Sequence, residues 1–569
     1  MIQLARFRPK IISALRDYST GHFIKDLSSG ITVGLIALPL AIAFAIASGL
    51  KPEAGLIAGV VGGFLISALG GSKVQIGGPA GAFVVIVYGI VEQYGYANLI
   101  LSTFLAGLLL ITMGLFRVGN LIRFIPVAII IGFTSGIAVL IGVSQVKDAL
   151  GLPIDKLPAD LFSQIHTLFT ALPHTNPYAL LMCALTLTII AAWPLLARTL
   201  ANKIPWLTHV PGIIIALIGA TIANQFLNWP IETIWSRFGD IPNGLPSPTI
   251  PQLDWETAKK LFAPTLTIGL LGAIESLLCA RVADNLSEDK HDPNQELMGQ
   301  GIANIVVPFF GGLPVTGTIA RTATNAKAGA QTPISGVIHS AVILLIMVVA
   351  APLARNIPMA TLAGILIFIA WGMFDTHEFK RLKQFNLTYR SILLGTFALT
   401  LIFDLTVAVE VGLMLACIFF IYRISSLTQV EPITLPENLS NVDELHLSDE
   451  SQLPRVEAYK IYGSLFFGAV HKIESLYDPS DDQRKYANII ILEMHQLINV
   501  DTSAMDALNT LAKNLKKHDS QLIICAPNPQ PESLMRRSGF MELIGDSNLV
   551  ADLDSAFRRA QEILEHPCK

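Results

Sequence analysis

Charged side chains are scarce in this sequence of 569 residues. They make up 14% of the chain, against about 25% in average soluble domains, while hydrophobic residues make up 52%. The formal net charge is -4, so no basic excess suggests a nucleic-acid partner. The composition therefore indicates a protein that resides in a lipid bilayer.

Cysteines are few and unpaired in spacing. The five lie at Cys183, Cys279, Cys417, Cys525 and Cys568, with no CxxC among them. This pattern argues against a disulfide framework or a zinc site. No nucleophile–base pair or metal cluster occurs in the apolar segments, so we expect no enzyme, no metal and no cofactor.

The N-terminal segment, residues 1–25, carries no cleavable signal by its pattern. Basic residues precede the first apolar run, at Arg6, Arg8, Lys10, Arg16 and Lys25. A small-residue cleavage site after a short apolar core is missing.

Apolar segments fill residues 26–425, which we expect to form the membrane domain. A helical span needs roughly 20 apolar residues. Fourteen spans are predicted, near residues 27–48, 53–70, 78–92, 96–116, 122–142, 176–198, 207–225, 261–282, 294–312, 316–328, 335–352, 358–375, 387–403 and 404–425.

Lysine and arginine concentrate in the loops that follow even-numbered spans, as between residues 380 and 383. Loops rich in these residues face the cytoplasm. We therefore expect a multi-pass protein of the bacterial inner membrane with both termini in the cytoplasm.

An internal repeat relates residues 26–225 to residues 261–425. The third span of each half is short and follows a break rich in glycine and proline, Gly77-Gly78-Pro79-Ala80-Gly81-Ala82 in one and Gly311-Gly312-Leu313-Pro314-Val315-Thr316-Gly317-Thr318 in the other. Seven spans per half make the halves inverted. Paired interruptions of this kind indicate a transporter site near the midplane.

These breaks predict an anion site. A half-helix that begins inside the membrane exposes unsatisfied N–H groups and the positive end of its dipole. Gly81 and Gly317 allow a ligand close to the backbone. The alternative is that these glycines only permit tight packing of helices.

Two ionisable residues lie inside predicted spans, where charges are costly and usually functional. Arg321 follows the second break by about a turn and would add positive charge to the site. Glu275 lies midway along the eighth span. Burial disfavours a charged carboxylate, so Glu275 could take up a proton with the anion. The alternative is a structural Glu275–Arg321 ion pair.

The C-terminal region differs from the membrane domain in composition and in hydrophobic pattern. Residues 426–454 read as a polar linker, and residues 455–569 alternate strands with amphipathic helices, which predicts a small α/β domain. Asp501 is a candidate N-cap for a helix over 503–516. No Gly-rich phosphate loop accompanies it.

Several passages together resemble the SulP family of anion permeases, relatives of prestin. They include Gly30-Ile31-Thr32-Val33-Gly34 with Leu38-Pro39, Gly77-Gly78-Pro79, Gly132-Phe133-Thr134-Ser135-Gly136 and Gly299-Gln300-Gly301 with Asn304. The resemblance covers nearly the whole chain. It implies a seven-plus-seven inverted repeat with core and gate domains, an elevator-like movement, a homodimer and a C-terminal cytosolic STAS domain.

Family substrate positions would fall on Leu40, Phe44, Ala80 and Ala320-Arg321, beside the half-helix starts at Gly81 and at Gly317, Thr318 and Ile319. Glu275 would be the coupling carboxylate, and its identity favours protons over sodium. In related STAS domains the loop at Thr502 and Ser503 holds a phosphorylated residue. Helix capping alone is the alternative there, and a cytosolic protein partner of the domain stays open.

Within the family the sequence is most similar to DauA-type transporters, through Ala273-Ile274-Glu275-Ser276-Leu277-Leu278-Cys279-Ala280 and Pro333-Ile334-Ser335 with Val337-Ile338-His339-Ser340. This similarity implies proton-coupled symport of four-carbon dicarboxylates, such as succinate, fumarate or aspartate. Sulfate or bicarbonate transport, a passive anion channel and a membrane sensor remain alternatives. Leu40 replaces the glutamine of many family members, which weighs against sulfate.

Overall fold

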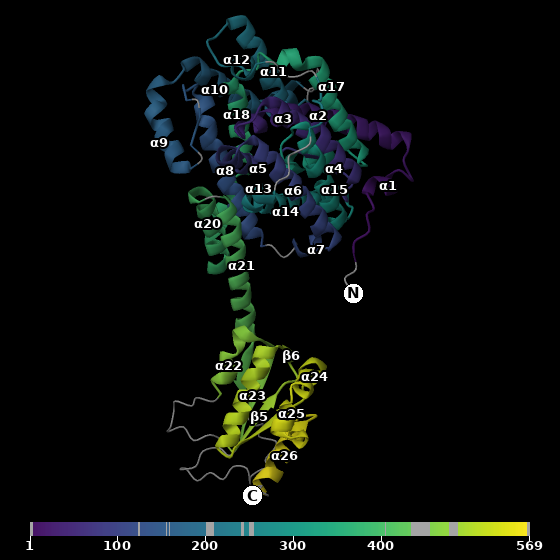
Figure 1. Ribbon diagram of the computed structural model, residues 1–569, viewed down its shortest axis with the longest axis vertical. Coiled ribbons are helices and arrows are strands. Elements are labelled where there is room, and N and C mark those ends of the chain that lie inside the picture. The colour runs from purple at the N-terminus through teal and green to yellow at the C-terminus, as the bar shows by residue number, and fades with distance from the viewer. Residues whose placement is uncertain are drawn as a thin grey trace. The chain divides into compact units, whose positions relative to one another are not determined.

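The computed structural model describes residues 4–122, 126–154, 156–158, 160–200, 210–239, 244–249, 255–403, 405–433, 456–476 and 488–565. The chain divides into two compact units, Met1–Met414 and Leu415–Lys569. The first unit is a bundle of helices and the second contains a β-sheet with helices against it (Figure 1). The division falls inside the last long apolar helix.

One group of helices in the first unit is called the core here. Its members are α2 (Thr20–Ala47), α3 (Pro52–Ile57) continued by η1 (Ala58–Gly62) and α4 (Gly63–Leu69), α5 (Gly81–Tyr94), α6 (Tyr96–Leu115), α14 (Phe262–Ser287), α15 (Pro293–Val306), α16 (Ile319–Lys327) and α17 (Ile334–Ala354). Within it α2 packs along α17, and α6 packs along both α14 and α15. Helices of the two sequence halves are therefore interleaved.

A second group is called the gate. It comprises α8 (Val127–Ala149), α10 (Pro177–Leu200), α11 (Gly212–Leu227), α18 (Met359–Met373), α20 (Leu387–Ile402) and, by its position in the sequence alone, α21 (Leu405–Leu427), which contains the division between the two units. α8 packs along α18 and α20, and α10 packs along α11 and α18. Core and gate meet where α2 contacts α11 and α18, and where α5 contacts α8.

All fourteen predicted spans coincide with these core and gate segments. Seven segments of the described chain are long and apolar enough to cross a membrane, and α5, α11, α17 and α20 contain shorter apolar stretches. α16 has only 9 residues. The two spans that the sequence marks as short, α5 and α16, are therefore short in the structure as well.

Shorter helices connect the spans. They are α1 (Lys10–Ala14), α7 (Gly119–Ile122), α9 (Leu161–Ala171), η2 (Leu172–His174), α12 (Ile234–Phe238), α13 (Trp255–Lys260), η4 (Val307–Phe310), α19 (Thr376–Arg381) and η5 (Leu382–Gln384). Residues 1–25 are predicted to form a terminal segment, yet α2 already begins at Thr20, because Ser19 accepts a hydrogen bond from the His22 N–H as its N-cap.

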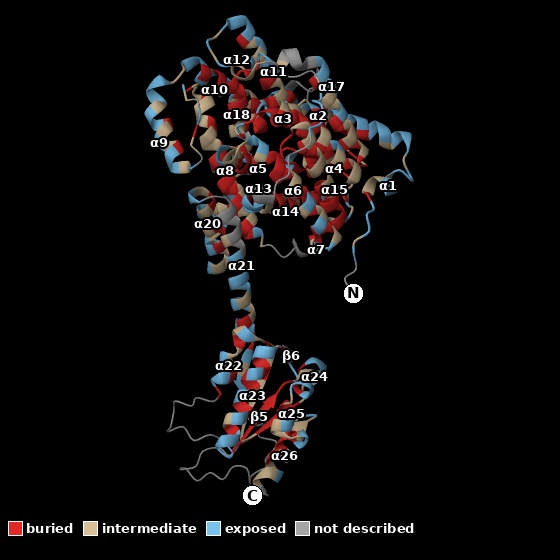
Figure 2. Ribbon diagram, in the orientation of Figure 1, coloured by how far each residue is buried: buried red, intermediate tan, exposed pale blue. Residues whose placement is uncertain are grey.

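Apolar packing concentrates in the middle of the helical unit, where buried residues predominate (Figure 2). Side chains from both halves contribute to one cluster, including Phe44 and Phe83 from the first half and Leu313 and Ile365 from the second. This shared cluster joins the halves around the place where the two short helices begin.

The second unit carries a sheet of the order β3-β4-β5-β7-β8, with β6 paired to β4. The strands are β3 (Gln429–Pro432), β4 (Val456–Leu465), β5 (Ile489–Glu493), β6 (Leu497–Val500), β7 (Gln521–Cys525) and β8 (Leu549–Val550). β4, β5, β7 and β8 run parallel, whereas β3 is antiparallel to β4. The helices are α22 (His471–Glu474), α23 (Thr502–Lys517), α24 (Pro529–Arg537), α25 (Phe540–Ile544) and α26 (Leu553–Glu565), with the short turns η7 (Phe467–Ala469) and η8 (Asp546–Asn548).

Both faces of this sheet are covered, as the apolar run of β5 requires. Ile490 and Leu492 join one apolar cluster with α23, while Ile489 and Ile491 join another with α26. Burial also raises the pKa of the Cys525 thiol in β7 to about 12, so this cysteine is a neutral core residue.

The linker prediction needs a correction. The sequence assigns residues 426–454 to an irregular linker, but Gln429–Pro432 form β3 and pair with β4 from Tyr462 to Tyr459. A single short strand with Pro432 at its end carries too weak a pattern to be recognised. The rest of the proposed linker, from residue 434, lies outside the described residues.

Candidate functional site

The two breaks of the repeat meet in the structure. Gly77–Gly78 forms the two-residue strand β1, which pairs antiparallel with β2 (Thr316–Gly317). The Thr318 N–H and hydroxyl both donate to the Ile76 carbonyl, at 2.9 and 3.0 Å. We call this pairing the crossing. α5 and α16 begin directly after it, so the starts of both short helices lie at one place.

Neither short helix has a side-chain cap. Ala80 precedes α5 and Thr318 precedes α16, and neither side chain accepts a hydrogen bond from the first turn. The first N–H groups of a helix lack partners within the helix, so without a side-chain cap they stay available to a ligand. Two uncapped starts at one crossing concentrate backbone donors and positive dipole ends there, which is the arrangement that binds anions.

The two starts differ in what covers them. Leu40, Phe44, Ala80 and Gly81 are buried at the start of α5. A Cβ placed on Gly81 would lie 3.4 Å from Phe44 Cε1 and 3.2 Å from Met373 Sδ of the gate. At the start of α16, by contrast, Ile319 and Ala320 are exposed. The crossing is therefore covered beside α5 and accessible beside α16.

Arg321 lies behind the crossing. Its side chain is 2% exposed, and a Cβ on Gly78 would lie 2.6 Å from its Nη1 atom. Gly78 has φ of +151°, so both the backbone conformation and the closeness of the guanidinium require glycine there. Nη1 and Nη2 have no hydrogen-bond partner in the described chain, so a buried cation faces the crossing without a counter-charge.

Glu275 does not pair with Arg321. Its side chain is partly buried, and its Oε2 atom has no hydrogen-bond partner among the described residues. The self-neutralising ion pair, the structural alternative for these two residues, is not formed. α14 touches the crossing on either side of Glu275: the Gly272 carbonyl accepts from the Thr316 hydroxyl at 3.1 Å, and Cys279 Cβ lies 3.1 Å from the Cβ position of Gly317.

Gln75 and Glu296 were missed by sequence reasoning. Gln75 Nε2 donates to Ser276 Oγ and to Glu296 Oε1, both at 2.9 Å. Glu296 also accepts from the N–H groups of Gly71 and Ser72. This buried carboxylate therefore fixes the loop that leads into β1 and ties it to the residue after Glu275.

Asp26 makes the corresponding contact on the other side of the crossing. It is fully buried and accepts from the N–H groups of Gln331 and Thr332, at 2.7 and 3.1 Å, and from the Thr332 hydroxyl at 2.5 Å. It thereby fixes the loop between α16 and α17. In the sequence, Asp26 and Glu296 are each an acidic residue near one end of an apolar span. An ordinary charge at the membrane interface has the same position, so the sequence does not distinguish the two roles.

His339 and Cys279 are both fully buried. Cys279 Sγ contacts Thr322 Oγ1 at 3.0 Å, so the cysteine packs between helices and does not line an open cavity. In the described residues no group of three or more His, Cys, Asp or Glu side chains could hold a metal ion.

In the second unit Asp501 caps α23, because its side chain accepts from the Ala504 N–H at 2.8 Å. Thr502 and Ser503 follow in the first turn and are exposed. Asp501 also accepts from the Phe467 N–H at 3.1 Å. The predicted cap is confirmed, and both hydroxyls are accessible.

The apolar helices of the described chain, whose two sequence halves meet at two helix starts, define a membrane transporter of small anions. The chain belongs to the sulfate permease family, whose model matches residues 23–395, and a STAS domain model matches residues 451–556. Family membership and the two-domain architecture are therefore as the sequence indicates, and the protein is a transporter and not an enzyme.

Known relatives agree with this assignment. The "Putative sulfate transporter YvdB" of Bacillus subtilis is 41% identical over 531 residues, which cover 93% of this chain and 96% of that protein. The bicarbonate transporter BicA of Synechocystis is 28% identical and 94% of each chain is covered. The solved structure of SLC26A9 covers 98% of this chain and 93% of its own, with a TM-score of 0.82 at 17% identity, which shows a shared fold.

Proposed function

We propose that this protein is a proton-coupled symporter of small anions, with four-carbon dicarboxylates such as succinate, fumarate and aspartate as its substrates. The observation that carries the anion site is the pair of uncapped helix starts at the crossing, with an unpaired guanidinium behind it. Leu40, Phe44, Ala80 and Gly81 would contact the anion from one side, and Gly317, Thr318, Ile319, Ala320 and Arg321 from the other.

Arg321 supports the site through its charge. An uncompensated guanidinium that is buried is costly, and a bound anion at the crossing would supply the missing counter-charge. Two helix ends alone attract an anion modestly, by about 0.3–1 kcal/mol each at exposed sites. A buried cation acts through a low dielectric and adds substantially to that attraction.

Glu275 is the proposed proton carrier, with protons rather than sodium as the coupling ion. It lies between two contacts of α14 with the crossing, at Gly272 and Cys279, which are seven residues apart and so share a helix face. Because a negative carboxylate repels an arriving anion, protonation of Glu275 would favour anion binding. This coupling requires no cofactor.

Sulfate is the second candidate substrate, because the relative with 41% identity is described as a putative sulfate transporter. Bicarbonate follows from the less similar BicA proteins. Leu40 gives the site an apolar wall, which suits the methylene groups of a dicarboxylate better than the compact, fully polar sulfate. A passive channel is the alternative mechanism.

The proposed movement is a displacement of the core against the gate. It is supported by the contacts at Gly81, where Phe44 of the core and Met373 of the gate cover one helix start. We further propose that the protein is a homodimer in the bacterial inner membrane, with both termini in the cytoplasm. The STAS domain would then be a cytosolic regulatory module.

Phosphorylation of Thr502 or Ser503 is the proposed regulatory event, supported by the exposure of both hydroxyls at the start of α23. Mass spectrometry of protein purified from its host should find phosphate there. Recovery of only unmodified peptide under several growth conditions would contradict this part of the proposal.

Uptake by the full chain in proteoliposomes tests the proposed function. An imposed proton gradient should concentrate labelled succinate inside the vesicles, and a sodium gradient alone should not. Unlabelled fumarate and aspartate should compete better than sulfate or bicarbonate. Stronger competition by sulfate would replace the substrate assignment, and unitary currents without accumulation would replace symport by a channel.

A further inference from the structure

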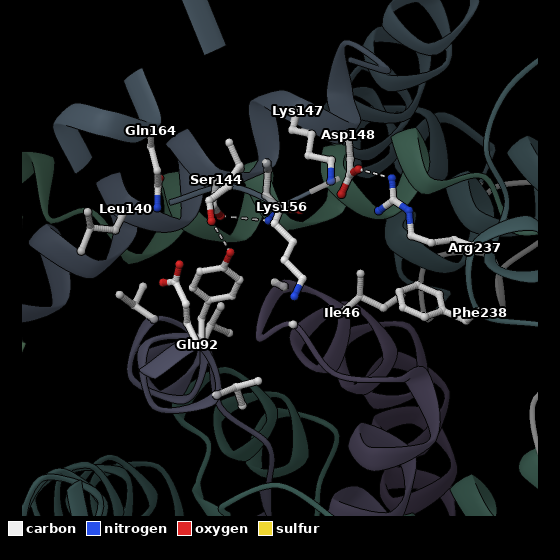
Figure 3. Close-up of a pocket in the computed structure, with 18 residues that line it drawn as sticks. Ile46, Glu92, Leu140, Ser144, Lys147, Asp148, Lys156, Gln164, Arg237 and Phe238 are labelled. Carbon is white, nitrogen blue, oxygen red and sulfur yellow. Dashed lines mark hydrogen bonds and ion pairs between the residues drawn. The ribbon is translucent and has the colours of Figure 1, made fainter. Parts of the chain in front are cut away.

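A cavity whose lining combines apolar and charged side chains lies on the membrane face opposite the N-terminal segment, between core and gate. α2 runs from Thr20 to Ala47, and the cavity is lined by its last residues together with α5, α8, α9, α12 and the α8–α9 loop. Its volume is about 430 Å³. We call it the far vestibule (Figure 3).

The far vestibule lies one helical turn from the proposed anion site. Ala47 is one turn beyond Phe44 on α2, and Val84 is one turn beyond Gly81 on α5. Phe44 itself lies against Gly81, so it separates the vestibule floor from the crossing. A small displacement of α2 and α5 against the gate would join the two spaces.

Lys156 points into this cavity. Figure 3 shows its ammonium group directed toward the ends of α2 and α5. In the described chain no ion pair is formed by Lys156. The other charges around the vestibule are Lys147, Arg237, Asp148 and Glu92.

Neither of these two carboxylates is paired with Lys156. Asp148 is engaged by Arg237, with 2.7 Å between its Oδ1 and Nη2, whereas Glu92 is exposed at the rim of α5. Arg237 is also paired with Glu232, so its charge is offset within its own ion pairs. Lys156 therefore contributes a positive charge that no ion pair engages among the described residues, and such a charge in a cavity raises the local concentration of anions.

Hydroxyl groups of the core and the gate also face the vestibule. Tyr88 of α5 and Ser144 of α8 both line it, and the Tyr88 hydroxyl donates to the Leu157 carbonyl of the α8–α9 loop. Lys156 directly precedes Leu157, whose carbonyl accepts the hydrogen bond that joins α5 to the α8–α9 loop. The lysine is therefore held beside a junction that must change when the core moves.

We propose that the far vestibule is a loading subsite for the transported anion, in which Lys156 receives a carboxylate or other oxyanion before it passes Phe44 to the crossing. This inference rests on the proposed transport function. Lys156 would thus bind the anion before the anion reaches the two helix starts. It would do so only for anions that arrive from the far face of the membrane.

Sided kinetics of the full chain test this subsite with three variants. Lys156→Gln removes the charge, Lys156→Arg keeps it, and Lys51→Gln removes an exposed charge from the same face outside the vestibule. Initial rates are measured in intact cells, where the far face is outside in the proposed orientation, and in inverted vesicles.

Lys156→Gln should raise the KM for labelled succinate about 3- to 10-fold in cells, with kcat within about twofold, because steering by one charge acts on capture. The KM in inverted vesicles should stay unchanged. High salt should reduce the difference, Lys156→Arg should restore the wild-type KM, and Lys51→Gln should have no effect.

Two results overturn the subsite alone: an unchanged KM for Lys156→Gln in cells, or an equal shift with Lys51→Gln. A shift of the same size from both faces would also overturn it, because the lysine would then act through the fold. A wild-type protein that transports no anion would refute the proposed function as well, which keeps the two failures distinguishable.

Discussion

The starts of α5 and α16 have the same backbone arrangement and opposite chemistry. The third residue of α5 is Phe83 and the third residue of α16 is Arg321, and both are among the largest fully buried side chains of the described chain. The first helices of the two halves differ in the same way. α2 carries the apolar residues Leu40 and Phe44, whereas α14 carries the acidic residue Glu275. Both halves of the repeat supply backbone N–H donors at a helix start. Only the second half supplies charged side chains, Glu275 and Arg321.

Accessibility follows the same division. The start of α5 lies under Phe44 and Met373, whereas Ile319 and Ala320 at the start of α16 are exposed. In this conformation the chain is open beside Ile319 and Ala320, whereas Thr318 and Arg321 of the same helix start are buried. In the proposed mechanism the apolar half acts as a cover and the charged half as the binding and coupling surface.

Glycine substitutions at the two halves should give the largest contrast. Gly317→Ala should abolish transport, because its Cβ would lie 2.0 Å from Gln75 Nε2 and 3.1 Å from Cys279 Cβ. A Cβ at Gly81 would meet only contacts of 3.2 Å or more, so Gly81→Ala should weaken anion contact at that helix start and reduce transport far less. Uptake normalised to folded protein in the membrane checks both. Equal loss in the two variants would contradict a functional difference between the halves.

Replacement of Phe83 and Arg321, the third residues of α5 and α16, should separate the effect of charge on anion binding from the effect of packing on stability. Arg321→Gln should weaken anion binding about tenfold or more, since a buried positive charge faces the site. Phe83→Leu changes a buried side chain at the matching position and should lower stability by about 1–1.5 kcal/mol with little change in affinity. Calorimetric titration of both purified proteins measures the effect. Unaltered affinity in Arg321→Gln would remove Arg321 from the site.

Glu275→Gln should uncouple transport without preventing it. The variant imitates the protonated carboxyl group, so anion exchange should continue while a proton gradient no longer drives accumulation. Counterflow and gradient-driven uptake in the same vesicles distinguish these activities. Glu275→Asp serves as the control that retains a titratable group. Gradient-driven accumulation by Glu275→Gln at the wild-type level would show that the proton binds elsewhere.

The carboxylates that fix the loops should give the smallest effects on transport and clear effects on stability. Glu296→Gln and Asp26→Asn each keep the shape of the side chain and weaken hydrogen bonds to buried N–H groups, for a cost of about 1–3 kcal/mol each. Thermal unfolding in detergent should show a lowered Tm for both variants. Wild-type Tm values would mean that these loops are held by other contacts.

Much of the fold could be predicted from the sequence, because apolar run length determines spans and the Gly/Pro breaks interrupt them. The meeting of the breaks followed from their equivalent positions in an inverted repeat. The lack of pairing between Glu275 and Arg321 could not be predicted, since spacing along two helices gives no information on which way their side chains point. Asp26, Gln75 and Glu296 were missed because their partners are backbone N–H groups of distant loops, which leave no local pattern. β3 was missed because four residues carry too little periodicity.

The most direct test of the anion site is a crystal structure of the full chain with bromosuccinate, whose bromine can be located by anomalous scattering. The account predicts a peak at the crossing, between the starts of α5 and α16, and its loss in Arg321→Gln. Selenate should give a weaker peak at the same place if dicarboxylates are preferred. Ordered bromosuccinate away from both helix starts, with none at the crossing, would contradict the account.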